Sequence, residues 1–498
     1  MNIFNKVAVI CSFIAIPFTM MGVSPKRGIS WQQGANNLNS HHASLLSEGV
    51  SWVYNWGPDA ENASVYNEDF YFVPMAWNGY YDANRIRTWL KNHPETKYLL
   101  GFNEPNFADQ AAMTPAQAVA KWPDLEAMAQ EFGVKLVAPA LNFSGSAVGG
   151  KYWGIYEWYD EFFRLYPNAK VDCLALHCYM NWYSALQWFA LDYFYKDLYN
   201  PSNENYGKYP NLVKFLDNFK NTNGHFPRMM LTEFCAWEYD GFLTGVDFQI
   251  DQMTQKVQKL EQSDLVEGYA WFMGNAGNAN DFPYMSVFQT NTSTSGLSEL
   301  GKVYVHMSDF DKSRYYSPGE TIAAKDYVEA TMDNQQIKLR SNTDSESKIA
   351  LQIEMPANGQ TDYLINLTQA GTYQLDCRVK STANSTLTLY SDNNNIGQVT
   401  VSNSNGNWQN RQLMVQLPAG KHTLKIRNTG GSTIYLTAFQ INSSTGVENI
   451  VTESAESNEI LEVFTLQGTR VNSSNIDTLP AGIYLLRMKD GRTLKICR

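Results

Sequence analysis

Hydrophobic and polar positions follow two different periods along the first 316 residues. Eight apolar runs have the length of buried strands, and amphipathic stretches of helical period separate many of them. The strand candidates are GISWQQG, VSWVYNWG, FYFVPMAWNG, YLLGFNEPN, KLVAPALNF, VDCLALHCYM, RMMLTEFCAWE and VEGYAWFMG. The helical patterns cover residues 83–91, 114–132, 152–166, 209–222 and 248–262.

Strands and helices that alternate over about 290 residues predict an α/β fold, namely a (β/α)8 TIM barrel over residues 25–317. Doubly wound sheets alternate in the same way. They carry a glycine-rich phosphate turn after the first strand, however, and no such turn follows the first strand here. We therefore predict the barrel.

From about residue 317 the helical period disappears. Short strands of alternating apolar and polar residues follow one another between turns rich in Asn, Ser and Gly, which predicts an all-β sandwich over residues 318–444. A linker rich in Ser and Glu comes next. Two hairpin-like segments after it predict a small C-terminal β domain over residues 445–498.

The N-terminus differs from both regions. Lys6 precedes a mostly apolar stretch over residues 7–21, and small residues follow at 22–24. This is the length of the hydrophobic part of a signal peptide and is short for a membrane span. We expect residues 1–24 to be a signal peptide and the mature protein to be exported and soluble, with no transmembrane segment.

Charge and aromatic content narrow the class of partner. The 498 residues include 38 Lys plus Arg against 49 Asp plus Glu, a net charge of −11. Nucleic-acid binding needs basic side chains that neutralise phosphates, so we expect no nucleic-acid partner. Thirteen Trp and 29 Tyr are present. Most of these rings fill cores, and we expect some to lie on surfaces where they stack against a ligand.

The cysteines do not predict a disulfide framework or a zinc site. Five remain after the signal peptide, at irregular spacing: Cys173, Cys178, Cys235, Cys377 and Cys497. Cys173 and Cys178 flank His177, but a strand would spread these side chains over both of its faces. We expect no metal and no cofactor in the barrel.

Candidate chemistry lies at the ends of the predicted strands, because active sites of such barrels are at the C-terminal ends. The fourth strand ends in Asn103 and Glu104, and the seventh ends in Glu233. The sixth ends in His177 and Tyr179, which share a face because alternate strand residues point the same way. We expect these side chains to meet at the mouth of the barrel.

Two opposed carboxylates suit glycoside hydrolysis, in which one protonates the leaving oxygen while the other attacks the anomeric carbon or activates water. The alternative for either glutamate is a salt bridge. Pro105 fixes its own φ, and we expect it to bias Glu104 toward an extended backbone. Glu238 and Asp240 are rival carboxylates, but they fall beyond the strand and are interpreted as loop or subsite residues.

A sugar site also needs aromatic platforms. Several tryptophans lie at predicted strand ends, and we expect four of them to line the cleft, with core packing as the alternative for each: Trp56, Trp77, Trp237 and Trp271. Core packing is the favoured interpretation for Trp52.

The motifs GFNEPN, LALHCY and LTEF together resemble glycoside hydrolase family 128, over residues 25–317. That family contains retaining β-1,3-glucanases on a (β/α)8 barrel related to clan A. The resemblance implies that Glu104 is the acid/base and Glu233 the nucleophile. It also implies that Asn103 binds the sugar 2-hydroxyl, that Tyr179 holds the nucleophile, and that His177 contacts the sugar.

Two geometric expectations follow from retention. The two carboxyl groups should be about 5 to 5.5 Å apart, whereas inversion would need about 6.5 to 9.5 Å. We also expect a raised pKa for Glu104, because an acid has to keep its proton near neutrality.

The second region resembles carbohydrate-binding module family 6 through TIAAKDYVEA, AGTYQLDCRV and LPAGKHTLKI. Sugar binding and a simple spacer role both stay open, and so does the structural calcium that some members of that family hold. Trp408 is its single tryptophan. The tail resembles C-terminal sorting domains of Bacteroidetes secretion, through LEVFTLQGTRV and LPAGIYLLRMKDGRTLKI. With the signal peptide, this implies a secreted, periplasmic or outer-membrane-surface protein.

The sequence therefore predicts a secreted, monomeric, retaining endo-β-1,3-glucanase that acts on β-glucan by double displacement. Two alternatives stay open. One is another clan A hydrolase, such as a β-1,4- or β-1,6-glucanase or a mannanase. The other is a glycan-binding protein without activity, against which the presence of both Glu104 and Glu233 argues.

Overall fold

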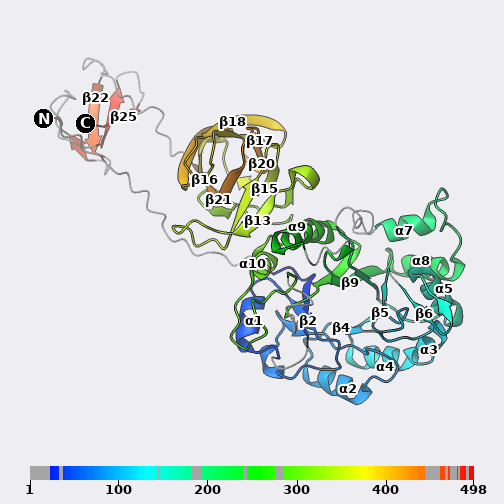
Figure 1. Ribbon diagram of the computed structural model, residues 1–498. Helices are drawn as coiled ribbons and strands as arrows, with labels where there is room; N and C mark the ends of the chain where they lie inside the picture. Colours follow the sequence, from blue (N-terminus) through cyan, green and yellow to red (C-terminus); the bar gives the residue numbers. More distant parts are fainter. Residues whose placement is uncertain are drawn as a thin grey trace.

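The computed structural model contains a barrel, a β-sandwich and a small C-terminal sheet (Figure 1). It describes residues 23–32, 37–143, 145–181, 192–238, 244–275, 284–443, 460–465, 469–471, 479, 483–488 and 493–497. Nearly all of the expected signal peptide, and Asp240, lie outside the described residues.

A parallel sheet in the order β3-β2-β1-β10-β9-β8-β5-β4 forms the barrel. An isolated bridge between Met75 and Leu100 joins its two edges, and Leu100 N also donates to Pro74 O at 3.0 Å. The eight predicted strands and the fold class are therefore confirmed. The strands are β1 (Arg27–Ser30), β2 (Trp52–Tyr54), β3 (Tyr71–Phe72), β4 (Tyr98–Leu100), β5 (Lys135–Asn142), β8 (Cys173–Cys178), β9 (Arg228–Phe234) and β10 (Val266–Trp271).

Helices cover the outside of this sheet, and each predicted helical pattern contains one or two of them. The pattern at 114–132 is two helices, because Pro123 cannot continue a helix interior but fits its first turn. The Thr114 side chain caps the first of them by accepting from Gln117 N at 3.3 Å. The helices are α1 (Ser40–Leu46), α2 (Ala83–Asn92), α3 (Pro115–Val119), α4 (Trp122–Phe132), α5 (Ile155–Leu165), α7 (Asp192–Tyr199), α8 (Pro210–Asn223), α9 (Val246–Gln262) and α10 (Glu299–His306).

Trp52 fills the interior of the barrel, which agrees with its interpretation as a core residue. It is fully buried, and small residues of the neighbouring strands make room for its ring. A Cβ on Gly28 would come within 2.2 Å of Trp52 Cε2, and one on Gly268 within 3.4 Å of Trp52 Cζ2. The Trp52 ring thus leaves no room for a side chain at position 28, whereas position 268 is in ordinary contact with it.

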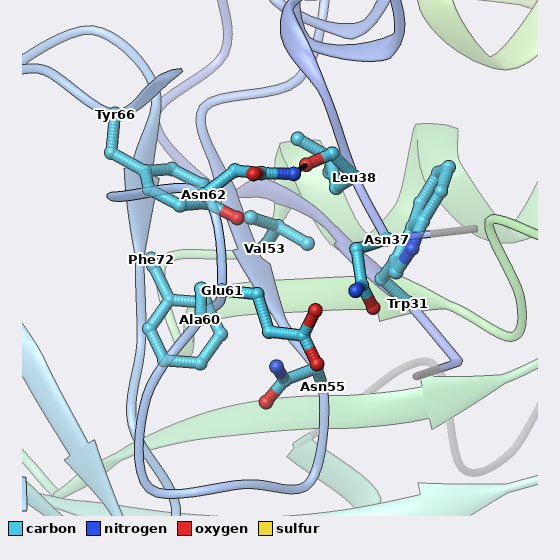
Figure 2. Close-up of a pocket in the computed structure, with 10 residues that line it drawn as sticks. All are labelled: Trp31, Asn37, Leu38, Val53, Asn55, Ala60, Glu61, Asn62, Tyr66 and Phe72. Carbon is cyan, nitrogen blue, oxygen red and sulfur yellow. Dashed lines mark hydrogen bonds between the residues drawn. The ribbon is translucent and has the colours of Figure 1, made fainter. Parts of the chain in front are cut away.

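A cavity of about 300 Å³, which includes open solvent, lies on the other side of β2 (Figure 2). Val53 and Asn55 face it, whereas Tyr54 and Trp56 face the barrel interior, as strand alternation requires. The cavity is therefore separate from the barrel mouth. Its lining is Trp31, Asn37, Leu38, Val53, Asn55, Ala60, Glu61, Asn62, Tyr66 and Phe72.

The second region is a sandwich of two antiparallel sheets. One sheet has the order β13-β14-β21-β16-β19 with β11 beside β21, and the other has the order β12-β15-β20-β17-β18. The strands are β11 (Thr321–Ala323), β12 (Glu329–Ala330), β13 (Lys338–Ser341), β14 (Leu351–Met355), β15 (Gln360–Leu367), β16 (Gly371–Lys380), β17 (Ser385–Ser391), β18 (Asn394–Val401), β19 (Gln409–Leu417), β20 (Gly420–Asn428) and β21 (Ile434–Ser443).

The sandwich packs against α9 and α10 of the barrel (Figure 1). Arg340 Nη1 donates to Asp251 Oδ1 at 2.8 Å, and Gln255 Nε2 donates to Gln336 Oε1 at 2.7 Å. Because Gln255 is buried, this polar contact is part of the interior of the protein.

The C-terminal sheet has the order β23-β22-β24-β25. Its strands are β22 (Ile460–Thr465), β23 (Arg470–Val471), β24 (Ile483–Met488) and β25 (Thr493–Cys497). In the described part of the chain, no helix has the length and apolar character to cross a membrane.

Candidate active site

Glu104 lies just after β4 at the mouth of the barrel, in a backbone conformation that the sequence did not predict. Its φ is +42°, so the expected extended backbone is wrong. One tertiary and one local hydrogen bond hold this turn: Glu104 N donates to Ala140 O at 2.8 Å, and Phe107 N donates to Glu104 O at 2.9 Å. Left-handed backbone at a non-glycine residue costs about 1 to 3 kcal/mol and is concentrated at functional sites.

Glu233, at the end of β9, accepts hydrogen bonds from three neutral side chains. Trp56 Nε1 donates to Oε1 at 2.7 Å, and Tyr54 Oη donates to the same oxygen at 3.2 Å. Tyr179 Oη donates to Oε2. Burial and the Glu233 charge raise the pKa of Tyr54 and of Tyr179 well above the ordinary value, so both phenols stay protonated and act as donors.

His177 is fully buried between the two carboxylates. Its Nδ1 lies 2.6 Å from Glu104 Oε1 and 3.4 Å from Glu233 Oε2, and its Nε2 lies 2.9 Å from Thr232 Oγ1. Burial opposes a charge on the ring, but the Glu233 carboxylate and the hydrogen bond with Glu104 outweigh it and raise the pKa of His177. The structure thus places His177 against the carboxylates.

The pKa of Glu104 differs in direction from the expectation. Burial acts to raise it, but the hydrogen bond and charge of His177, with the hydrogen bond from Asn142, lower the pKa of Glu104 below its ordinary value. Asn142 Nδ2 donates to Glu104 Oε1 at 2.7 Å. The expected raised pKa is therefore wrong for the protein without substrate, because the imidazole beside Glu104 competes for the proton.

The two carboxylates are close together. One ligand atom from each of Glu104, His177 and Glu233 lies within 4.8 Å of the other two. This is near the separation of retaining glycosidases and well below that of inverting ones. The three residues also form a group that could hold a metal ion. An ion there would have to displace hydrogen bonds that the two glutamates already accept, such as those from Trp56 and Asn142.

Aromatic rings gather around Glu233, and two of them, Tyr54 and Phe272, were not predicted. Phe272 lies 6.0 Å from Trp56, 5.6 Å from Tyr179 and 6.3 Å from Trp237, measured between ring centroids. Trp56 therefore lies at Glu233, and Trp237 lies beside Tyr179; that both rings line a sugar cleft stays a prediction. Trp77 is half-buried in the segment that follows β3 and packs against the barrel interior, and its carbonyl accepts from Asn103 N at 2.9 Å.

Trp271, which was expected to line the cleft, does not do so. It is fully buried on the outer side of β10, where it packs against Phe234 and Tyr304 and its Nε1 donates to Met285 O at 2.8 Å. Ala270, its neighbour in sequence, faces the interior. Because faces alternate, Phe272 rather than Trp271 belongs to the site.

Asn103 precedes Glu104, and its expected contact with the sugar stays a prediction. Its Nδ2 donates to Gln110 Oε1 at 3.2 Å, whereas its Oδ1 is buried and has no hydrogen-bond partner among the described residues. A buried carbonyl oxygen without a partner is costly, and a ligand hydroxyl would satisfy it. Glu238, the rival carboxylate, accepts a hydrogen bond from Asn181 N at 2.9 Å and so connects two loop segments.

Sequence analysis did not identify Tyr54, Asn142 or Phe272 as site residues. A signal for Tyr54 was present, because Trp52, Tyr54 and Trp56 alternate along one strand and share a face. Asn142 and Phe272 follow from register and strand ends that only the folded barrel specifies.

Comparison with protein families agrees with this geometry. Residues 28–304, more than half of the chain, match the family described as glycosyl hydrolase catalytic core. The chain belongs to this family. Residues 324–444 match carbohydrate binding module family 6, so both resemblances are confirmed at family level.

Two similar solved structures are glycoside hydrolase family 128 (subgroup II) endo-β-1,3-glucanases. That of Pseudomonas viridiflava is 32% identical, covering 57% of this chain and 97% of its own, with a TM-score of 0.42. That of Sorangium cellulosum is 27% identical, and the match covers 56% of this chain and 97% of the other, with a TM-score of 0.39. Comparison with curated proteins gave no match. The sorting-domain prediction stays a prediction.

Proposed function

We propose that this glycosyl hydrolase is a secreted, retaining endo-β-1,3-glucanase. The observation that supports it most directly is the carboxylate pair at the barrel mouth, within 4.8 Å and in two different settings. Glu233 accepts hydrogen bonds from neutral donors, which suits a nucleophile, whereas Glu104 Oε1 lies beside the imidazole of His177.

The reaction proceeds in two steps. In the first, Glu233 attacks the anomeric carbon, the glycosidic bond breaks, and the proton of Glu104 goes to the departing oxygen. In the second, water attacks the same carbon and gives its proton to Glu104, which releases Glu233. Glu104 and His177 titrate as a coupled pair, so the proton that the first step consumes belongs to both groups.

The substrate proposal rests on the relatives. The two structures that are 32% and 27% identical are both endo-β-1,3-glucanases, which favours a β-1,3-glucan over the other linkages. Export by the N-terminal signal and the sorting-type tail would bring the protein to such a polymer outside the cell. The sandwich would hold the polymer near the barrel.

Product analysis tests this function. The purified protein, Glu104→Gln and Glu233→Gln are incubated with laminarin, curdlan, cellulose, pustulan and mannan. We expect internal cleavage of laminarin and curdlan by the wild type and a loss of about 10³-fold or more in each variant, since each removes one of the two reacting groups. Proton NMR of the first product should show the β-anomer.

Each other outcome has a defined meaning. Cleavage of cellulose, pustulan or mannan alone would replace the substrate while leaving the mechanism. An α-anomer as first product would rule out retention. Hydrolysis of none of the five polymers would contradict the enzyme assignment, and full activity in either variant would contradict the role of that glutamate.

A further inference from the structure

We propose that Asn142 and Asn106 are positioning residues for the acid/base Glu104. They determine which of its two carboxylate oxygens faces the substrate. This inference rests on the proposed function. Neither asparagine was identified from the sequence, and each lies on a different segment at the barrel mouth.

Asn142 contacts Glu104 directly from the end of β5. Its Nδ2 donates to Oε1 at 2.7 Å, and His177 Nδ1 lies 2.6 Å from the same oxygen. Among the described residues, no side chain donates to Glu104 Oε2. The two neighbours thus anchor Oε1 and leave Oε2 as the oxygen that meets the leaving group.

Asn106 holds Asn142 by its backbone. Its Oδ1 accepts from Asn142 N at 3.2 Å, and its Nδ2 donates to Asn142 O at 2.9 Å and to Trp153 O at 3.3 Å. Asn106 is fully buried, and its hydrogen bond with Trp153 O is buried with it. A side-chain amide that pairs with both backbone groups of one residue fixes that residue as a neighbouring strand would.

The contacts form a closed loop. Glu104 and Asn106 are separated only by Pro105, whose ring restricts the backbone between them. Asn106 donates a hydrogen bond to the backbone of Asn142, and the Asn142 side chain donates one to Glu104. The segment that carries the acid therefore also sets the position of the group that orients it, which suits a site requiring placement within about 0.5 Å.

The expected chemical effect is specific. Donation from Asn142 stabilises the ionised carboxylate, so its removal should raise the pKa of Glu104 and move the alkaline limb of kcat/KM to higher pH. Protonation of the leaving group should also become slower, because Oε1 then keeps only its contact with His177. Attack by Glu233 should not, since Asn142 has no hydrogen bond with it among the described residues.

Aryl β-laminaribiosides separate these effects. Phenol is a poor leaving group that needs the acid, whereas 2,4-dinitrophenol leaves without it. For Asn142→Ala and Asn106→Ala in the full chain, we expect kcat/KM to fall about 10- to 100-fold with the phenyl substrate and less than about 3-fold with the dinitrophenyl substrate. Asn142→Asp should move the alkaline limb furthest, because it places a second carboxylate against Glu104.

Asn428 provides a matched control. It is a fully buried asparagine of the sandwich whose Nδ2 donates to Met355 O at 2.9 Å, far along the chain from the site. Asn428→Ala should lower stability but leave the leaving-group dependence and the pH profile unchanged. If Asn106→Ala does not fold, Asn142→Ala and Asn142→Asp still test the proposal.

The results distinguish two failures. Equal losses with both leaving groups, or an unmoved alkaline limb in the Asn142 variants, would overturn the positioning role. Glu104→Gln is measured in parallel. If it too shows no leaving-group dependence, the acid/base role of Glu104, and with it the proposed function, is wrong.

Discussion

Buried carboxylates lie at both ends of the barrel, but their partners differ. At the N-terminal end, Glu267 accepts from Tyr98 Oη at 2.8 Å, from Arg228 Nη1 at 3.0 Å and from Lys135 Nζ. Burial acts to raise its pKa, yet Lys135, Tyr98 and Arg228 lower the pKa of Glu267 to about 2. At the mouth, the three side chains that donate hydrogen bonds to Glu233 are neutral, and the imidazole of His177 lies 3.4 Å from its Oε2.

The difference explains why only one end can perform chemistry. Two cations hold Glu267 ionised across the physiological range, so it can neither give nor take a proton there. At the mouth, phenol, indole and amide groups donate hydrogen bonds to the two carboxylates but bring no permanent positive charge. The titratable neighbour there is His177. Proton exchange therefore stays possible at the mouth. At the N-terminal end of the barrel, called the floor below, Glu267 and its cations form a structural ion pair.

Glu233→Gln should give the largest effect. We expect kcat/KM on the proposed β-1,3-glucan substrate to fall about 10⁴-fold, equivalent to about 5.5 kcal/mol, because the proposed nucleophile is lost. Urea unfolding should show no loss of stability, since a neutral amide relieves repulsion with Glu104. A variant that is inactive only because it is unfolded would contradict the contrast between the two ends.

A matched pair of tyrosines gives the next effect. Tyr179→Phe removes a donor to Glu233, and we expect kcat to fall about 100-fold, as when one preorganised donor is lost. Tyr98→Phe removes a donor to Glu267 and should leave kcat unchanged. Steady-state kinetics of both variants test this, and similar losses in kcat would remove the distinction between mouth and floor.

Glu267→Gln should affect stability and not catalysis. We expect the free energy of unfolding to fall by about 2 kcal/mol at pH 7 while kcat stays unchanged. This figure allows for solvent screening, because both cations are half-exposed. A carboxyl whose pKa is lowered by folding stabilises the protein above its unfolded value, about 4.3, and this contribution disappears as the pH falls toward 2. Urea unfolding of wild type and variant should therefore converge over that window, and a constant difference would contradict the ion-pair explanation.

The pH dependence of activity should reflect His177. Because its pKa is raised, the proton that it shares with Glu104 is present below about pH 6.5 and is lost as the pH rises beyond that value. We expect kcat/KM of the wild type to fall on the alkaline side with a midpoint above 6.5. His177→Gln should move that midpoint, and an unmoved limb would mean that the imidazole has no part in the proton equilibrium.

Lys135→Met should have the smallest effect. The Lys135 side chain is 52% exposed, and Arg228 remains to pair with Glu267. We expect the free energy of unfolding to fall by about 0.5 kcal/mol, and by less at high salt, with unchanged activity. A loss as large as that of Glu267→Gln would show that the floor depends on this one cation.

Much of the molecule could be predicted from local pattern. Apolar runs of strand length gave all eight barrel strands, because a parallel sheet buried on both faces leaves continuous hydrophobic segments in the chain. Polar residues at the ends of such runs located Glu104, His177, Tyr179 and Glu233, which the structure brings together.

Other features could not be predicted because they depend on distant segments. Trp271 faces outward because it alternates along β10 with Ala270, which lies in the interior beside Trp52. Phe272 takes the place in the site that Trp271 was expected to take. The pKa of Glu104 has the opposite direction to the expected one because His177, 73 positions away, lies 2.6 Å from its oxygen.

By itself, the sequence determined the order of strands and the four polar residues at their ends, because alternation and length are written in neighbouring residues. Tertiary structure alone decided the left-handed backbone of Glu104, the anchoring of its Oε1 by Asn142, and the pairing of Asn142 with Asn106. These depend on hydrogen bonds between segments that meet only when the barrel closes. The physical reason is that burial makes such contacts strong, and no local pattern of residues encodes which segments will be buried together.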